Sequence, residues 1–257
     1  MAQETPSPAA VDFIAKVEQA YRRLIESHMA DPDMGLGGRL LYAGELDGEG
    51  RALVAGANIA GAATLAAIAD RAAQKQAIRD GIADFLVNSL DESLRILKNQ
   101  LRKRETVAVC VGLSSDAIEG EMQERGVQPD LLRVDALPQV EAHRAIASAE
   151  STIVLWSVAS APAQWLPKLD AIALDCIEPD QWQSRQWVRL APRYLGRLAG
   201  GARMLRCGPQ SATKFIEQVR DRVSRGEVSV AVEVQMGNSS GKLDTLRFAP
   251  GEPGQRL

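Results

Sequence analysis

The stretch that decides the fold runs from Gly38 to Arg71 and reads GRLLYAGELDGEGRALVAGANIAGAATLAAIADR. It opens with an apolar run at Arg39–Ala43 that predicts a short strand, and this strand leads directly into a glycine-rich turn. Small residues from Arg51 to Ala62 predict a helix that packs closely against a sheet, and Thr64–Ile68 predicts a second strand. A strand, a turn, a helix and a second strand form a βαβ unit, in which the two strands lie parallel.

Strand-like and helix-like segments alternate outward from this unit. Upstream, apolar residues at helical spacing predict a helix from Val11 to about Met29. Downstream, Leu90–Arg104 predicts an amphipathic helix and the β-branched run Thr106–Gly112 a strand. In the second half we expect helices at 138–149, 184–199 and 210–224, and strands at 152–158, 170–177, 202–206 and 227–236. The alternation predicts an α/β protein, Rossmann-like, with three layers (α/β/α) and a mainly parallel, doubly wound sheet.

Composition divides the chain into four segments. Residues 1–10 are rich in Pro, Ser and Ala, residues 237–257 are rich in Gly, Ser and Pro, and both are expected to be flexible tails. Residues 11–136 form the Rossmann-like core. Residues 137–236 continue the α/β fold, and the sequence leaves open whether they belong to the same domain.

Composition also excludes several classes of function. The 257 residues carry a formal net charge of −3, whereas the binding domain of a nucleic-acid-binding protein is normally basic. The most apolar run, Ala52–Ala69, is dominated by Ala and Gly, so we expect no membrane-spanning helix and no membrane partner. The first twelve residues lack the basic and apolar regions of a secretory signal, and the three cysteines are widely spaced. We therefore predict a cytoplasmic protein.

The residues that could ligate a metal ion or carry out catalysis form no recognisable pattern. The cysteines form no CxxC pair, and neither His28 nor His143 belongs to an arrangement typical of a triad or a metal site. We predict no metal site, and the catalytic residues stay unknown. One alternative is an enzyme of different chemistry, because the acidic segment Asp175–Asp180 follows the predicted strand at 170–177, where active-site acids often lie.

Two turns at the ends of predicted strands are candidates for ligand binding, because open parallel sheets bind ligands outside the carboxyl ends of their strands. The first turn contains Gly44, Gly48 and Gly50, which let the backbone approach a phosphate at the start of a helix. Asp70 follows Gly50 by twenty residues, a position from which a carboxylate binds a ribose. The second turn adds four candidates that follow the strongest strand: Gly112, Ser114, Ser115 and Asp116.

A purely structural role for both turns remains the alternative. The first turn reads GxxxGxG rather than GxGxxG, and Glu45, Asp47 and Glu49 lie where an anion would bind. Each carboxylate would oppose a pyrophosphate by roughly 1 kcal/mol at a surface-like dielectric constant. Ser and Asp at the start of a helix commonly serve only as caps.

Taken together, these segments resemble the NAD-binding core of urocanase (urocanate hydratase). The resemblance rests on Gly38–Arg71, on RDGIADFLVNSLDESLRIL at 79–97 and on VCVGLSSDAIEGEMQERGVQPDLL at 109–132. It covers roughly residues 11–135, in the same order and without large gaps. It implies a Rossmann-type core, and NAD, another nucleotide or a small anionic ligand over the two turns.

The chain departs from the urocanase pattern in its glycine-rich turn and its ribose contact. Asp47 and Arg51 stand where the family has glycines, while Gly48 and Gly50 are kept. Ile68 stands where the family has its ribose-binding Glu. Asp70, two residues on and therefore on the same face of the strand, is a possible substitute.

A second departure concerns catalysis. After RGVQPD the chain reads RVDALPQVE, where the family has DQTSAHD at its cofactor site, and the second turn has Leu113 in place of an Asn. The catalytic cysteine of the family lies in a region that this chain does not match, and neither Cys176 nor Cys207 can be assigned its role. We expect a divergent, stand-alone relative that does not hydrate urocanate.

The second half carries two further patterns. Its tryptophans, the only four of the chain, predict either a local core or an aromatic interface, and the interface would make the protein a non-catalytic homo-oligomer with an empty cleft. They are Trp156, Trp165, Trp182 and Trp187. A stripe of arginines at every fourth residue predicts a solvated face or a surface for an anion or an acidic partner. It consists of Arg185, Arg189, Arg193 and Arg197.

Overall fold

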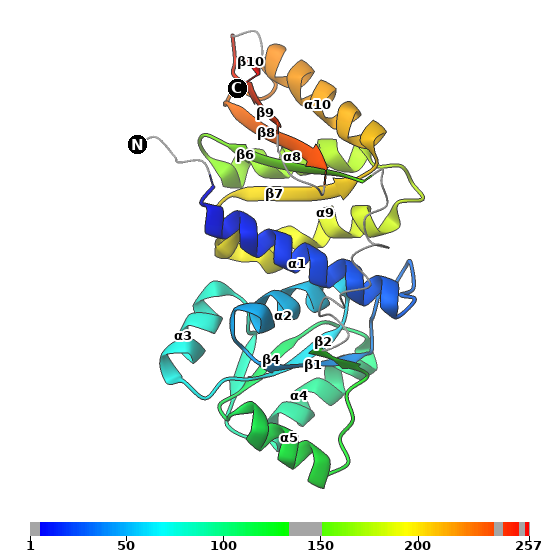
Figure 1. Cartoon of the computed structure of the whole chain (residues 1–257), viewed down its shortest axis with the longest axis vertical. Coiled ribbons are helices and arrows are strands. Elements are labelled where there is room, and N and C mark those ends of the chain that lie inside the picture. Colours follow the sequence, from blue (N-terminus) through cyan, green and yellow to red (C-terminus); the bar gives the residue numbers. More distant parts are fainter. Residues whose placement is uncertain (1–5, 134–150, 239–243, 252–254, 257) are drawn as a thin grey trace. The chain divides into compact units, whose positions relative to one another are not determined.

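The computed structural model describes residues 6–133, 151–238, 244–251 and 255–256. The chain divides into two compact units (Figure 1). We call Ala15–Leu137 with Arg193–Leu198 the parallel-sheet unit. Met1–Ile14, Pro138–Pro192 and Ala199–Leu257 form the antiparallel-sheet unit. The predicted helix at 138–149 lies outside the described residues.

The parallel-sheet unit contains a sheet in the order β3-β4-β2-β1-β5, and all neighbouring strands run parallel. The strands are β1 (Leu40–Glu45), β2 (Ala63–Ala67), β3 (Phe85–Val87), β4 (Ala108–Val111) and β5 (Leu131–Leu132). The helices between them are α2 (Gly48–Ala60), α3 (Arg71–Asp80), α4 (Leu90–Lys103) and α5 (Ser115–Glu124). Strands β2 and β4 lie on one side of β1 in the sheet, and β5, which comes last in the chain, lies on the other side.

Helices cover both faces of this sheet (Figure 1). Helices α4 and α5 pack on the face that carries the side chains of Tyr42, Leu65 and Val109. Helix α2 packs on β1 and β2 from the other face. Helix α1 (Pro8–Ser27), which belongs to this unit from Ala15 onward, lies against α2 so closely that a Cβ at Gly56 would be 2.9 Å from the carbonyl oxygen of Val17. The predicted three-layer α/β fold with a doubly wound parallel sheet is confirmed.

Local sequence explains where the helices of this unit begin and end. Asp47, Asp70, Ser89 and Ser114 are the N-caps of α2, α3, α4 and α5, and each side chain accepts a hydrogen bond from a backbone N–H of the first turn. Helices α2 and α3 end at Gly61 and Gly81, both in the left-handed conformation that glycine adopts without strain. The turns are therefore defined by residues a few positions apart.

The antiparallel-sheet unit contains a sheet in the order β10-β9-β8-β6-β7, and all its neighbouring strands run antiparallel. The strands are β6 (Thr152–Val158), β7 (Ala202–Cys207), β8 (Val232–Asn238), β9 (Asp244–Phe248) and β10 (Gln255–Arg256). The helices are α8 (Pro162–Cys176), α9 (Trp182–Leu195), which belongs to this unit up to Pro192, and α10 (Pro209–Ser224). A 3₁₀ helix, η1 (Gly196–Ala199), follows α9. Helices α8 and α10 pack against each other and against β6.

The structure differs from the sequence predictions in this second half. The parallel pattern does not continue beyond β5, because each later strand pairs antiparallel with its neighbours. The predicted strand at 170–177 is wrong, since these residues lie in α8 and its C-cap. Leu166, Leu169, Ala173 and Cys176 are buried at helical spacing, and a short apolar run alone does not separate a strand from a helix.

The predicted tails also contain regular structure. Helix α1 begins at Pro8, within the segment 1–10. Strand β9 lies within the segment 237–257, where Phe248 is buried and pairs with Val232 of β8. Strand β9 pairs with β8 on one side and with β10 on the other, so it lies inside the sheet. In the described part of the chain, no helix is both long enough and apolar enough to cross a membrane.

Candidate functional site

The candidate turns meet at one edge of the parallel sheet. Strands β4, β2 and β1 are neighbours, so their carboxyl ends lie side by side. The turn at 46–50 follows β1, the turn at 68–70 follows β2 and the turn at 112–114 follows β4. The structure therefore brings together the segments that hold all the predicted ligand-binding residues. We call this region the carboxyl edge.

The glycines of the first turn have different roles. Gly44 has a φ of +68° at a register shift in β1, so it needs the conformational freedom of glycine. Gly50 lies so close to β1 that a Cβ would be 2.2 Å from the carbonyl oxygen of Glu45. Gly48, in contrast, has no atom within 4 Å of a Cβ position and is exposed. Gly50 thus holds the turn against β1, and Gly48 leaves the start of α2 open to approach.

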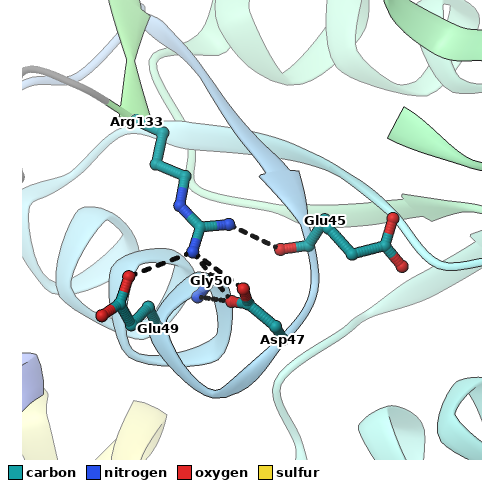
Figure 2. A network of polar contacts seen from close by, with 5 residues as sticks. All are labelled: Glu45, Asp47, Glu49, Gly50 and Arg133. Carbon is teal, nitrogen blue, oxygen red and sulfur yellow. Dashed lines mark hydrogen bonds and ion pairs between the residues drawn. The ribbon is translucent and has the colours of Figure 1, made fainter. Parts of the chain in front are cut away.

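Arg133, just after β5, closes the first turn (Figure 2). Its Nη2 donates to both carboxylate oxygens of Asp47, at 3.0 and 2.9 Å, and to Oε2 of Glu49 at 3.2 Å. Its Nη1 donates to the carbonyl oxygen of Glu45 at 3.1 Å. Oδ1 of Asp47 also accepts a hydrogen bond from the N–H of Gly50, at 2.7 Å. One guanidinium therefore links two acids of the turn and its backbone.

This network changes what the start of α2 can bind. The carboxylate of Asp47 accepts from Gly50 the same kind of backbone hydrogen bond that a phosphate would accept at a helix N-terminus. Partial burial raises the pKa of Asp47, but the hydrogen bonds from Gly50 and Arg133 lower it more, and the net pKa lies below the ordinary range. Asp47 is thus held ionised at the position where an anion would bind.

Sequence reasoning did not identify Arg133. It lies 86 residues from Asp47 in the chain, and only the pairing of β5 with β1 brings the two together. The only local signal is a basic residue that directly follows the apolar pair Leu131–Leu132, which forms β5.

Two of the other candidate residues of the carboxyl edge, Asp70 and Ser114, act as helix caps. Oδ1 of Asp70 accepts from the N–H of Ala73 at 2.7 Å, and the side chain is exposed. The hydroxyl of Ser114 accepts from the N–H of Ala117 at 3.4 Å. Ser115 and Asp116 follow in the first turn of α5. Gly112 is packed against α3, where a Cβ would be 3.2 Å from Nε2 of Gln74. Capping and ligand binding are compatible for Asp70, whose exposed carboxylate has a second oxygen.

A cavity of about 540 Å³ lies next to the first turn. It is bounded by β1, α5, the segment between α5 and β5, and Arg133. The residues that line it are Tyr42, Gly44, Glu119, Met122, Gln123, Gly126, Val127, Gln128, Pro129, Leu132 and Arg133. The chain reverses its direction of strand addition between β1 and β5, and crevices at such switch points bind ligands in doubly wound sheets. Of the predicted site residues, only Gly44 lines this cavity.

The acidic segment of the second half does not follow a strand. Asp175 lies in the last turn of α8, and Glu178 forms an ion pair with Lys214 of α10, with 2.6 Å between Oε1 and Nζ. The prediction that these acids lie at the carboxyl end of a strand is therefore wrong, for the reason given for 170–177. The segment belongs to the antiparallel-sheet unit, whereas the carboxyl edge belongs to the parallel-sheet unit.

The arginine stripe is not uniform. Nη1 of Arg185 donates to the carbonyl oxygens of Leu174 and Ile177, at 2.9 Å each, and so satisfies acceptors at the end of α8. Arg189, Arg193 and Arg197 are exposed. The first arginine has a structural role, and the exposure of the other three fits both expectations, a solvated face or a surface for an anion or an acidic partner.

The tryptophans contribute mainly to the core of the antiparallel-sheet unit. Trp156, Trp165 and Trp187 are buried, with 1, 8 and 2% of their surface exposed. The ring of Trp156 packs on Phe215 with a centroid distance of 4.9 Å. The expected local core is what these three rings form. A homo-oligomer through this half stays a prediction, and these three rings would not supply its surface.

The cysteines are buried and form no disulfide: Cys110, Cys176 and Cys207. Burial raises the pKa of Cys110 to about 12 and also raises the pKa of Cys176. Within the described ranges, no group of three or more His, Cys, Asp or Glu side chains is placed to hold a metal ion.

No protein-family model matches the sequence.

Proposed function

We propose that the parallel-sheet unit is a nucleotide-binding domain related to the NAD-binding core of urocanase, and that it does not hydrate urocanate. The observation that carries the proposal is the convergence of three helix starts at the carboxyl edge, after the neighbouring strands β1, β2 and β4. Free N–H groups and the helix dipole at such starts favour anionic groups.

Six of the eight predicted residues have a place in this proposal. The phosphates would approach α2 over Gly48, where no side chain blocks the backbone, while Gly50 holds the turn in place. The exposed carboxylate of Asp70 would accept hydrogen bonds from a ribose while it caps α3. The start of α5 at Ser114, Ser115 and Asp116 would form the far wall.

Asp47 sets the affinity of such a site. A phosphate at the start of α2 has to replace the carboxylate of Asp47 on the N–H of Gly50, and Arg133 would then bind the phosphate instead. Glu45 and Glu49 repel the same group. We therefore expect weak binding in the wild-type protein, with NAD as the first ligand to test and other nucleotides or small anions after it.

The cysteines support the absence of hydratase activity. All three are buried, and the raised pKa values of Cys110 and Cys176 keep these thiols protonated near neutral pH. Unpaired cysteines also fit the cytoplasmic location that we propose.

The test is thermal unfolding with NAD, ADP-ribose, adenosine and pyrophosphate. A ligand at one hundred times its dissociation constant stabilises the folded state by about 2.7 kcal/mol. In Asp47→Ser, which keeps a capping oxygen and removes the charge, the stabilisation by NAD and pyrophosphate should increase. Gly48→Leu, at a position with free space around it, should abolish the effect. No stabilisation by any of the four compounds, in the wild type and in Asp47→Ser, would refute nucleotide binding.

A further inference from the structure

The cavity beside the first turn has the size of a small-molecule site. Its volume of about 540 Å³ lies within the range of roughly 300–1,000 Å³ that is typical of ligand pockets. Its walls come from β1, α5 and the segment that leads from α5 into β5. These elements belong to one unit, so the cavity is defined by a single packed core.

Most of the wall is apolar. Met122 of α5, Val127 and Pro129 of the following segment and Leu132 of β5 face the cavity. Leu132, in the edge strand β5, is 44% exposed. A ligand with an apolar body would remove this surface from water, and that burial is favourable.

The charges around the cavity do not favour an anion. Only Glu119 and Arg133 carry a charge among its lining residues. The guanidinium of Arg133 forms ion pairs with the carboxylates of Asp47 and Glu49 and donates a hydrogen bond to the carbonyl oxygen of Glu45. Glu119 is exposed, and no ion pair of its carboxylate is found among the described residues. The uncompensated charge at the cavity is therefore negative.

The aromatic ring of Tyr42 adds to this preference. Tyr42 lines the cavity, and its hydroxyl donates to the carbonyl oxygen of Ser115 at 3.4 Å. Burial, then the charge of Glu119 and a side-chain hydrogen bond with Glu119, raise the pKa of Tyr42, so the phenol stays neutral. A carboxylate beside a neutral aromatic ring and apolar walls is a favourable environment for an organic cation, through charge-assisted hydrogen bonds and cation–π contacts.

We propose that this cavity binds an organic ammonium ion with an apolar body, of the arylalkylamine type, with the carboxylate of Glu119 as its counter-ion. The proposal does not depend on the nucleotide site proposed for the carboxyl edge. The two sites take ligands of opposite charge, and Arg133, whose network with the first turn is shown in Figure 2, also lines the cavity.

Isothermal titration calorimetry on the full chain tests the proposal with phenethylamine as the probe and 3-phenylpropionate as its matched anion. The amine should bind and the carboxylate should not. Glu119→Gln should weaken amine binding by roughly tenfold or more. Glu124→Gln is the control, since Glu124 is an exposed acid of the same helix that does not line the cavity.

Gln123→Trp provides a second test, because Gln123 is an exposed residue of α5 that lines the cavity, and a large ring there would fill it without disturbing the core. This variant should lose amine binding and keep its thermal stability. Absence of amine binding in the wild type, equal binding of amine and carboxylate, or equal affinities of Glu119→Gln and Glu124→Gln would each overturn the proposal. Stabilisation by NAD should be unchanged in Glu119→Gln, so failure at one site can be told from failure at the other.

Discussion

The two units bury their sheets with different kinds of side chain. In the parallel-sheet unit, β2 (ATLAA) and β4 (AVCV) are buried at every position and consist largely of small aliphatic residues. In the antiparallel-sheet unit, β7 (ARMLRC) contains two partly exposed arginines among buried residues, and large aromatic rings such as Trp156 and Phe215 fill the core. Helices on both faces exclude water from the central strands of a parallel sheet, whereas an antiparallel sheet can expose one face to solvent.

The units also place their charges differently. In the parallel-sheet unit, Asp47 and Arg133 meet at the carboxyl edge, where half of the Asp47 side chain is exposed. In the antiparallel-sheet unit, Asp170 of α8 and Arg203 of β7 form an ion pair at 3.1 Å with side-chain exposures of only 11 and 16%. Charges at an accessible edge can exchange partners with a ligand, whereas buried charges hold elements together. This difference supports our proposal that ligands bind to the parallel-sheet unit.

The largest expected effect tests how tightly the parallel-sheet unit depends on its first turn. Gly50→Ala should lower the free energy of unfolding by about 4 kcal/mol, because its Cβ would be 2.2 Å from the carbonyl oxygen of Glu45 and the backbone must move. Gly48→Ala, with nothing within 4 Å, should change it by less than about 0.5 kcal/mol. Urea unfolding of the two variants decides the matter. Equal values would mean that the turn is not packed against β1 as described.

The next effect concerns the buried ion pair of the antiparallel-sheet unit. Asp170→Ala leaves Arg203 without its partner in a largely buried position, and should cost about 3 kcal/mol of unfolding free energy. Asp175→Ala, an exposed acid of the same helix, is the control and should be nearly neutral. If the two variants are equally stable, the pair does not hold α8 to β7.

The pH dependence of this pair has a defined sign. Burial raises the pKa of Asp170 more than Arg203 lowers it, so the folded state holds its proton more tightly than the unfolded chain does. The contribution of Asp170 to stability therefore decreases as the pH rises from the ordinary Asp pKa towards the raised one.

A smaller effect tests how the antiparallel-sheet unit protects its outer strand β7. Nε1 of Trp187 donates to the carbonyl oxygen of Met204 at 2.6 Å, and the hydroxyl of Ser184 donates to that of Arg206 at 2.8 Å. Trp187→Phe removes one of these bonds and should cost about 1 kcal/mol. It should also increase concentration-dependent aggregation measured by light scattering, because unpaired edge groups can template strand addition. Trp182→Phe, at a half-buried position, is the control.

The smallest effect concerns the charge at the carboxyl edge. Because the pKa of Asp47 is lowered in the folded state, its contribution to stability is present above the ordinary Asp pKa and is lost as the pH falls through the lowered pKa. Asn is an equally good N-cap without this titration. The wild type should therefore be more stable than Asp47→Asn at neutral pH, by less than about 1 kcal/mol, and the difference should vanish at acid pH. A difference that does not depend on pH would argue against an ionised Asp47 in the network.

Prediction from sequence succeeded where a residue and its partner are close in the chain. The capping role of Ser114, the strand at 152–158 and the βαβ unit around Gly50 follow from patterns a few residues long. It failed at 170–177, where the apolar run fits either a strand or a helix and contacts with β6 and α10 select the helix.

The sequence by itself determined the order of elements in the first half, the parallel sheet and the turns at its carboxyl edge, because helical and strand periodicity, caps and glycines act over a few residues. Only the tertiary structure decided that Arg133 donates hydrogen bonds to Asp47 and that a cavity forms between β1, α5 and β5. It also decided that the later strands pair antiparallel. These features join residues that are distant in the chain, and they form only when strands select their neighbours in a packed sheet. The candidate ligand chemistry of this protein depends on those long-range contacts.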